Sequence, residues 1–296
     1  MRESTKQDVA STPCLMCGGL RHGRVFNEFG VDILRCRDCD HVFSSFPANP
    51  HFDGYWGAEV EDSDHGYWNT ARAHMHQDFF KRFILGRSGR LLDMGSGLGF
   101  FVKAMSGHVR WETRGCEISP AAVRYARETL GLKNVSCGRL EDADLPQDSF
   151  DIITMWDVLD HIPRPDPVLK HCHTLLREGG LCFIRTPNVY VQLPRARLNK
   201  LLRGMQPGVT YLQARHHAHH YSVSSIRRLL ERNGFSRIKF VHLQPIQSVS
   251  RSRRRLLQSV KKVGFEVVRA LAFASRGHVN FDNLFVLAYK DSMPRR

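Results

Sequence analysis

The sequence lacks any run of about eighteen uncharged apolar residues, so no segment predicts a membrane-spanning helix. Its beginning, MRESTKQDVAST, also lacks the apolar core of a secretory signal, and we therefore expect a cytoplasmic protein. In that compartment, eight cysteines favour metal ligands or core residues over disulfides. With 296 residues, 42% of them apolar, the chain is long enough for one large domain and a small additional module.

Acidic residues are scarce in the C-terminal third. From residue 190 onward, 21 Lys and Arg stand against four Asp and Glu, a balance of +17, whereas the whole chain carries +14. The first 189 residues are therefore slightly acidic, at about −3. Two basic amphipathic segments, at about 190–215 and 247–276, fit an anionic membrane surface or a phosphate-rich substrate, and equally a packed helix with a solvated basic side.

Four of the cysteines form two closely spaced pairs near the N-terminus. Cys14-x-x-Cys17 and Cys36-x-x-Cys39 are separated by 18 residues. Four thiolates at this spacing can converge tetrahedrally on one ion and leave no open coordination position. We therefore predict a structural zinc ribbon over residues 1–46, followed by a linker and a helix over 47–87.

The segment LLDMGSGLGF, residues 91–100, lies between an apolar run and a helical pattern, as at the entry of a βαβ unit. It lacks the Lys-Ser/Thr that a P-loop needs after its last glycine. It also lacks the third small residue of a dinucleotide fingerprint, where Phe100 or Val102 would stand. Asp93 would repel a pyrophosphate, but it would attract a cofactor that bears an ammonium and a sulfonium.

With these features the chain resembles the class I S-adenosylmethionine-dependent methyltransferases, over about residues 88–245 and in a last strand at 281–290. The resemblance implies an α/β fold over residues 88–296, with a doubly wound, mostly parallel, seven-stranded Rossmann-like sheet. The family's first motif, an acidic residue before Gly-x-Gly-x-Gly, is matched by Asp93, Gly95, Gly97 and Gly99.

The resemblance also implies the other cofactor contacts. Glu117 ends a second strand and is expected to bind both ribose hydroxyls. Many relatives have an Asp that binds the adenine amine directly after the glycine of the third strand. Here Arg139 follows Gly138, so Leu140 and Glu141 are expected to contact adenine. The complete predicted set is Asp93, Gly95, Ser96, Gly97, Gly99, Glu117, Ile118, Leu140, Glu141, Trp156 and Asp157.

Chemistry is expected where the strand FDIITMW ends, because ligands of open α/β sheets lie beyond the carboxyl ends of the strands. Asp157 either holds the cofactor's amino group or caps the loop. His161 is the candidate base for a hydroxyl acceptor, unless it caps the next turn or only shapes the pocket.

A histidine-rich stretch, ARHHAHHYSVSS, follows later in the chain. Its four histidines, His216, His217, His219 and His220, have no carboxylate at a matching spacing. The spacing therefore disfavours a metal site. The family resemblance implies instead that this segment borders the acceptor pocket, which leaves contact with substrate as one alternative.

The sequence thus predicts an S-adenosylmethionine-dependent methyltransferase whose acceptor is a small molecule or saccharide, with a lipid- or phosphate-linked acceptor included. The segments TMWDVLDHIPRP and TPN are typical of small-molecule members that modify quinones and glycans. The alternative is an RNA methyltransferase, since zinc-ribbon relatives act on ribosomal RNA and the chain is basic. Residues 14–46, however, balance four arginines against four acidic residues. Intact cofactor motifs disfavour a non-catalytic scaffold, and peripheral contact with an anionic membrane is a further expectation.

Overall fold

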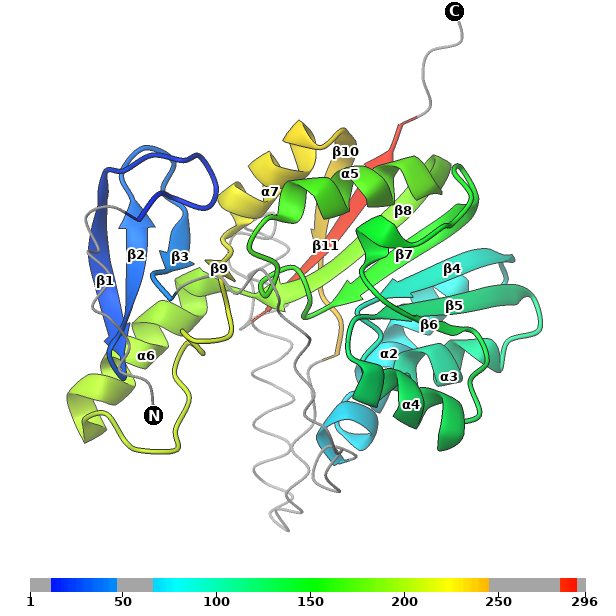
Figure 1. Cartoon of the computed structure of the whole chain (residues 1–296), viewed down its shortest axis with the longest axis horizontal. Helices are drawn as coiled ribbons and strands as arrows, with labels where there is room; N and C mark the ends of the chain where they lie inside the picture. The colour runs from blue at the N-terminus through cyan, green and yellow to red at the C-terminus, as the bar shows by residue number, and fades with distance from the viewer. Residues whose placement is uncertain (1–11, 47–65, 245–282, 292–296) are drawn as a thin grey trace, which may run out of the picture.

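The computed structural model describes residues 12–46, 66–244 and 283–291 (Figure 1). Its larger sheet has seven strands in the order β10-β11-β8-β7-β4-β5-β6. Strand β11 runs antiparallel to its two neighbours, and the other neighbouring strands pair in parallel. The predicted doubly wound, mostly parallel sheet is therefore confirmed. Its strands are β4 (Gly89–Met94), β5 (Trp111–Glu117), β6 (Val135–Cys137), β7 (Phe150–Trp156), β8 (Leu176–Pro187), β10 (Phe235–Val241) and β11 (Asn283–Lys290).

Helices cover both faces of this sheet (Figure 1). One face carries α5 (Pro165–Leu175) and α7 (Val223–Arg232), and the other carries α2 (Ala73–Phe79), α3 (Phe100–Ser106) and α4 (Pro120–Glu128). Neighbouring residues of β7 enter opposite layers, since Ile153 belongs to the core under α5 and α7 while Ile152 packs with α2 and α3. This two-sided burial explains why the strand is apolar almost without interruption.

The helix expected within residues 47–87 is present as α2 with a short π-helical turn on each side, Gly66–Thr70 and Phe80–Ile84. The basic insertion near residue 190 forms α6 (Val189–Arg203). The basic segment at 247–276 lies outside the described residues. Across the parts of the chain that the structure describes, no helix is both long enough and apolar enough to cross a membrane.

A second sheet of four strands contains β1 (His22–Glu28), β2 (Val31–Cys36), β3 (Val42–Ser44) and β9 (His219–His220), in that order. Strand β9 comes from the large domain and pairs antiparallel with β3, so that Val42 lies opposite His220 and Phe43 opposite His219. Helix α6 packs against this sheet through Val189, Leu193 and Ala196. Backbone hydrogen bonds between β3 and β9 therefore join the N-terminal module to the large domain.

Strand order locates the ligand crevice of the large sheet. The chain runs from β4 outward through β5 and β6, and then returns to the other side of β4 with β7 and β8. The crevice of a doubly wound sheet opens at such a reversal, beyond the carboxyl ends of the strands. The glycine loop after β4 and the turns after β5 and β7 all lie at this edge.

Candidate active site

The glycine loop adopts the backbone that its sequence predicts. Gly95, Gly97 and Gly99 all have positive φ, at 67°, 53° and 85°. Close packing adds a second constraint, because a Cβ on Gly95 would lie 2.5 Å from a methyl group of Val158, and one on Gly99 would lie 2.8 Å from Leu132. The loop thus brings bare backbone against the turn after β7 and ends at the N-terminus of α3.

Glu117 ends β5 beside the glycine loop. Its Oε2 accepts a hydrogen bond from the Gly97 N–H at 2.8 Å, and its Oε1 accepts one from the Ser119 N–H at 2.9 Å. Glu117 is only 6% exposed, and burial raises the pKa of its carboxyl group despite these backbone donors. Each oxygen retains a lone pair that can accept a hydrogen bond from a ligand hydroxyl.

Asp93 lies at the carboxyl end of β4, where it is 2% exposed. Its Oδ1 accepts a hydrogen bond from the Thr154 hydroxyl at 2.6 Å. Burial raises the pKa of Asp93 to about 8, against the opposing effect of this hydrogen bond, with Glu117 adding a smaller increase. A cation that binds next to such a carboxyl group lowers its pKa and favours its ionised form.

The remaining predicted cofactor residues lie around this edge. Ser96 and Ile118 follow the ends of β4 and β5, and Leu140 and Glu141 form a short 3₁₀ turn with Asp142 after β6. Glu141 is paired with Arg139 at 3.6 Å. Trp156 packs in the core among Phe79, Phe101 and Phe183 and is 6% exposed. Its contact with a cofactor therefore stays a prediction.

Asp157 occupies a left-handed backbone position, with φ at 57°, directly after β7. Its Oδ2 accepts hydrogen bonds from the guanidinium groups of Arg72, at 2.6 Å, and Arg185. Burial alone would raise the pKa of Asp157, but Arg185 and Arg72 outweigh it and lower that pKa. The three side chains carry a net charge of +1 at the crevice, and the predicted role of Asp157 toward a cofactor amino group remains untested.

His161 lies one turn beyond Val158, whose carbonyl accepts the His161 N–H at 3.0 Å. Its Nδ1 donates a hydrogen bond to the His216 carbonyl at 3.1 Å. In the neutral ring this places the lone pair on Nε2, which lies 3.7 Å from Asp160 Oδ2. His217 approaches the same carboxylate oxygen at 3.2 Å. The structure thus brings the histidine-rich stretch next to His161.

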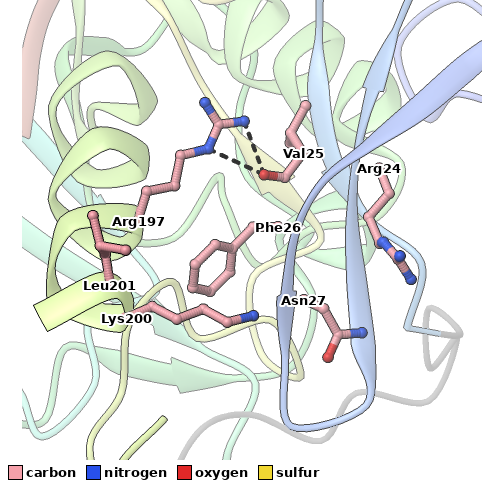
Figure 2. Close-up of a pocket in the computed structure, with 7 residues that line it drawn as sticks. All are labelled: Arg24, Val25, Phe26, Asn27, Arg197, Lys200 and Leu201. Atoms are coloured by element: carbon pink, nitrogen blue, oxygen red, sulfur yellow. Dashed lines mark hydrogen bonds between the residues drawn. The ribbon is translucent and has the colours of Figure 1, made fainter. Parts of the chain in front are cut away.

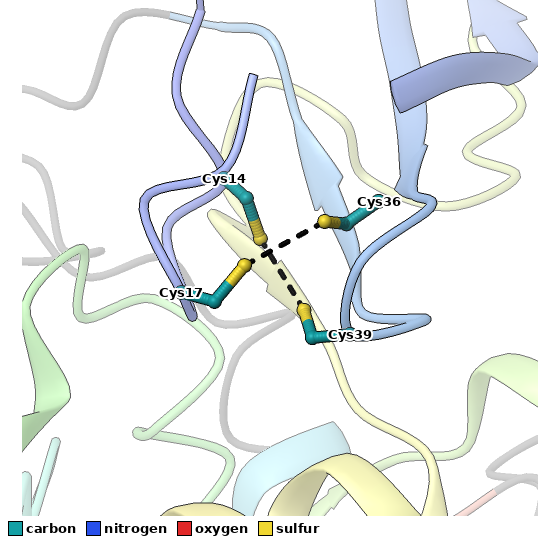
Figure 3. A group of neighbouring side chains, drawn as sticks. All are labelled: Cys14, Cys17, Cys36 and Cys39. Carbon is teal, nitrogen blue, oxygen red and sulfur yellow. Dashed lines mark hydrogen bonds between the residues drawn. The ribbon is translucent and has the colours of Figure 1, made fainter. Parts of the chain in front are cut away.

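The four cysteines of the N-terminal module converge, as Figure 3 shows. The Sγ atoms of Cys14 and Cys39 lie 3.6 Å apart, as do those of Cys17 and Cys36, and all four lie within 4.8 Å of one another. Four sulfurs bound tetrahedrally to zinc at 2.3 Å are about 3.8 Å apart. The donor set and its spacing therefore fit a structural zinc ion.

The N-terminal module also holds the segment that carries the histidines. The buried carboxylate of Glu28 accepts backbone N–H groups of Tyr211, Leu212 and Ala214, at 2.7, 3.2 and 2.8 Å. His219 donates from Nε2 to the Pro163 carbonyl, so its Nδ1 must accept the 2.9 Å hydrogen bond from His41 Nε2. Residues 211–220 therefore form a wall between the ribbon and the crevice.

A groove of about 770 Å³ opens elsewhere, between β1 and α6 (Figure 2). Arg197 donates two hydrogen bonds to the Val25 carbonyl there, and Lys200 lies over the ring of Phe26. Its lining residues come from β1 and α6, and none belongs to the predicted cofactor set. The groove is therefore not the cofactor crevice.

Sequence reasoning missed several residues of the site. Arg72, Arg185 and Asp160 reach the crevice from separate segments, and none belongs to a motif whose spacing predicts a contact. The contacts of Glu28 were also not predicted from the sequence. A carboxylate that a hairpin buries needs hydrogen-bond donors nearby, and here backbone N–H groups supply them. The signal for Asp160 was its place next to His161 at the end of a buried strand.

Comparison with known proteins assigns this chain to a protein family. A family model described as "Methyltransferase domain" matches residues 67–239, which is more than half of the chain. That range contains the glycine loop, Glu117, the turn after β7 and the histidine-rich segment. It begins after the four-cysteine module.

Curated relatives include two enzymes named ubiquinone biosynthesis O-methyltransferase. The one from Neisseria meningitidis serogroup C (strain 053442) is 30% identical over 108 residues, which are 34% of this chain and 45% of that protein. The one from Coxiella burnetii (strain Dugway 5J108-111) is 26% identical over 155 residues, 48% of this chain and 65% of that protein. The chain thus spans about half to two thirds of the length of these relatives.

Solved structures similar to this chain include S-adenosylmethionine-dependent methyltransferases from two organisms. The Archaeoglobus fulgidus protein is 17% identical and has a TM-score of 0.49, with 77% of this chain and 98% of that chain covered. The Aquifex aeolicus protein is 16% identical with a TM-score of 0.47, and the coverage is 78% and 94%.

Proposed function

Because the chain belongs to the methyltransferase domain family, we propose that it transfers the methyl group of S-adenosylmethionine to a small-molecule acceptor. The arrangement at the end of β5 carries this proposal. Glu117 is a buried carboxylate anchored by the glycine loop, so a group that can accept hydrogen bonds from a diol lies beside the glycine backbone at the N-terminus of α3. Such groups suit a nucleoside that carries no phosphate.

In this proposal each end of the cofactor meets a different part of the crevice. Glu117 accepts the ribose hydroxyls, and Ile118, Leu140 and Glu141 border the adenine. Asp93 faces the ammonium group, with Ser96 and the glycine backbone beside it. The cofactor's carboxylate suits the net positive group formed by Arg72, Asp157 and Arg185.

The acceptor is proposed to bind between the turn after β7 and the wall formed by residues 211–220. Methyl transfer is an in-line displacement at a carbon that the sulfonium already activates, so alignment and exclusion of water are the main tasks. His161 offers an imidazole lone pair that could take the acceptor's proton. The names of the curated relatives support a small hydroxylated acceptor.

We further propose that Cys14, Cys17, Cys36 and Cys39 bind one structural zinc ion. Their spacing matches tetrahedral thiolate coordination. Backbone N–H groups point at two of the sulfurs, from Met16 to Cys14 and from Asp38 to Cys36, both at 3.4 Å. Such donors stabilise thiolate charge.

Peripheral contact with an anionic membrane is the final part of the proposal. Leu198, Leu201 and Leu202 share one face of α6 and are 53, 81 and 69% exposed. Arg195 and Arg203 flank them on the same helix. A lipid-linked acceptor would be reached from such a surface.

In the direct test, the protein and S-adenosylmethionine are incubated with a lipid, glycan or RNA fraction that has been freed of other methyltransferases. The S-adenosylhomocysteine formed with each fraction is then measured. Product with the lipid or glycan fraction supports the proposal. Product confined to the RNA fraction would replace it with the RNA alternative. Absence of cofactor binding would remove both.

The protein is expected to bind one S-adenosylmethionine per chain, and Glu117→Ala is expected to weaken binding. Loss of ribose contacts to a carboxylate costs about 1.5–3 kcal/mol, or roughly 10- to 150-fold in Kd. Calorimetry measures this directly. Glu112→Ala provides the control, because Glu112 lies on the same strand but pairs with Arg90 and Arg114 at the surface. An unchanged affinity in the Glu117 variant would remove Glu117 from the site.

Cofactor affinity is expected to rise with pH between about 6 and 7.5. The pKa of Asp93 is about 8 in the cofactor-free chain, so binding next to a cation must first release its proton. The dependence can reach about tenfold per pH unit. Calorimetry at several pH values, repeated with Asp93→Asn, checks the cause, since the variant should show lower affinity and a flat profile. An equally steep profile in the variant would assign the proton elsewhere.

Replacing Leu198, Leu201 and Leu202 by glutamine is expected to reduce co-sedimentation with anionic vesicles by tenfold or more. Burying each leucine contributes about 1.5 kcal/mol or more. Leu85→Gln is the control, since Leu85 is 62% exposed but lies outside α6. Reversing the charges of Arg255, Lys262 and Arg269 should add to the loss if the second basic segment takes part. The membrane proposal would be contradicted if the wild-type protein binds RNA but does not co-sediment with anionic vesicles at low salt.

A further inference from the structure

Three side chains from two distant segments converge beside the acceptor side of the crevice. Asp160 and His161 follow β7, and His217 precedes β9. Asp160 Oδ2 lies 3.2 Å from His217 Nε2 and 3.7 Å from His161 Nε2, and the three atoms all lie within 4.8 Å of one another. Donors bound to one ion at 2.0–2.2 Å are about 3–3.6 Å apart. A small contraction would bring all three to a common ion.

The buried atoms of this cluster lack the hydrogen bonds that they would otherwise need. Asp160 is 1% exposed, and within the described part of the chain its Oδ2 accepts no hydrogen bond. His217 Nδ1 is likewise buried without a hydrogen bond among the described residues. An unsatisfied buried carboxylate oxygen is costly, and a bound cation would remove that cost.

A protonated His217 would supply the missing positive charge, but burial acts against that. It lowers the pKa of His217 well below its usual range, and the neighbouring His161 lowers it further. Imidazole binds a metal in its neutral form, through the lone pair of one ring nitrogen. Asp160 Oδ2 thus faces one ring nitrogen of each histidine, which is the arrangement that a shared cation requires.

Neighbouring groups already orient two of the three donors, His161 and Asp160, as metal ligands are usually oriented. His161 Nδ1 donates to the His216 carbonyl, which turns Nε2 toward Asp160. The Thr186 hydroxyl donates to Asp160 Oδ1 at 3.4 Å and leaves Oδ2 to the two rings. Histidines and carboxylates that bind metals commonly have such second hydrogen bonds.

We propose that Asp160, His161 and His217 bind one divalent transition-metal cation, such as Mn²⁺ or Zn²⁺, at the acceptor side of the crevice. Two imidazoles and one carboxylate suit first-row divalent cations, and three protein ligands leave open positions. The carboxylate that the histidine-rich stretch lacks in sequence comes from Asp160, 57 residues before His217. Asp157 is not a ligand, since Arg72 and Arg185 already hold it.

This inference rests on the proposed methyl transfer for its role but not for its existence. An acceptor hydroxyl would occupy an open position and lose its proton to water. Its oxygen electron pair would then form the O–CH₃ bond as the C–S bond breaks, which releases S-adenosylhomocysteine. The site lies next to the cofactor loop, because Val158 packs against Gly95 one turn before His161. His161 would then be a ligand rather than the general base.

The test is a titration of the zinc-containing protein with Mn²⁺, followed by the electron paramagnetic resonance signal of free Mn²⁺. Manganese has little affinity for thiolates, so the ribbon keeps its zinc. We expect one Mn²⁺ per chain in the wild type, with Asp160→Asn and His217→Gln each weakening binding by more than tenfold. His216→Gln is the matched control, since His216 is exposed and the contact with His161 is made by its backbone carbonyl, which the substitution keeps.

Zinc analysis runs in parallel and should give two ions per chain when excess Zn²⁺ is supplied and then removed by gel filtration. Wild-type protein that takes up neither Mn²⁺ nor a second Zn²⁺ would overturn the inference, as would unchanged Mn²⁺ affinity in both folded variants. Cofactor calorimetry on the same samples separates the two proposals. Wild-type protein that binds no cofactor would contradict the methyltransferase proposal. Wild-type protein that binds the cofactor but takes up no metal beyond the ribbon's zinc would contradict only the metal site.

Discussion

Cys36→Ser is expected to remove zinc from the ribbon and to abolish methyl transfer, while the cofactor still binds. Apparent zinc-binding free energies of four-ligand structural sites are about 10–16 kcal/mol, so the module depends heavily on its ion. The module in turn holds residues 211–220 through Glu28, through β3 and through His41. The wall of the acceptor site should therefore be lost together with the zinc.

Three measurements on one preparation check this expectation. Elemental analysis should show about one zinc in the wild type and little in the variant. Calorimetry should give a cofactor affinity within about threefold of the wild type, because the glycine loop and Glu117 lie in the other sheet. The methyl-transfer rate should fall at least 100-fold. Cys137→Ser is the control, since Cys137 is exposed and lies outside the four-cysteine cluster.

Two outcomes would contradict this account. Freshly prepared wild-type protein without zinc would show that the four thiols are not a metal site. Full activity in a zinc-free variant would show that the ribbon does not support the acceptor wall. Glu28→Gln separates the effects further, since it keeps all four cysteines but weakens three backbone contacts of the wall. We expect it to retain zinc and to lose activity.

Local patterns in the sequence indicated the glycine loop and the buried strands, and the resemblance to class I methyltransferases implied the large sheet that they form. Gly95 and Gly99 stand where positive φ and close packing exclude a side chain, and such positions recur at fixed spacing. The buried strand at 150–156 was evident from its continuous apolar run, because helices cover both faces of a parallel sheet. The family match agrees with this reading.

Contacts between distant segments could not be predicted in the same way. The histidine-rich stretch looked unsuitable for a metal because no carboxylate stood near it, yet folding brings Asp160 to His217. Likewise, pairing of β9 with β3 joins residues far apart in the chain and makes the ribbon part of the larger fold. Such contacts depend on how the layers pack, and residue spacing along the chain does not encode that packing.

Asp157→Ala is expected to lower the free energy of unfolding by about 3–5 kcal/mol. The side chains of Arg72 and Arg185 are 3 and 5% exposed, and Asp157 is the carboxylate between them. Its removal leaves two guanidinium groups buried next to one another. The melting temperature should fall by roughly 6–20 °C, since each kcal/mol corresponds to about 2–4 °C in a chain of this size.

The pH dependence of this contribution follows from the direction of the pKa shift. The pKa of Asp157 is lowered in the folded chain, with burial opposing and the two arginines prevailing. Its stabilising effect is therefore complete above the unfolded-state pKa of about 3.9 and is lost as pH falls below that value toward the folded-state pKa. Between pH 5 and 8 the difference between wild type and variant should stay constant.

Urea unfolding of wild type and variant measures the difference, with Asp148→Ala as the control. Asp148 also pairs with a cation, Lys290, but it is 64% exposed, so its loss should cost at most about 1 kcal/mol. The result also decides the role of Asp157. If Asp157 mainly bound the cofactor's amino group, Asp157→Ala would weaken cofactor binding and change stability by less than about 1 kcal/mol. A large loss of stability that Arg72→Met partly relieves would instead identify the carboxylate as the counter-ion of the two arginines, because removing one cation restores the charge balance.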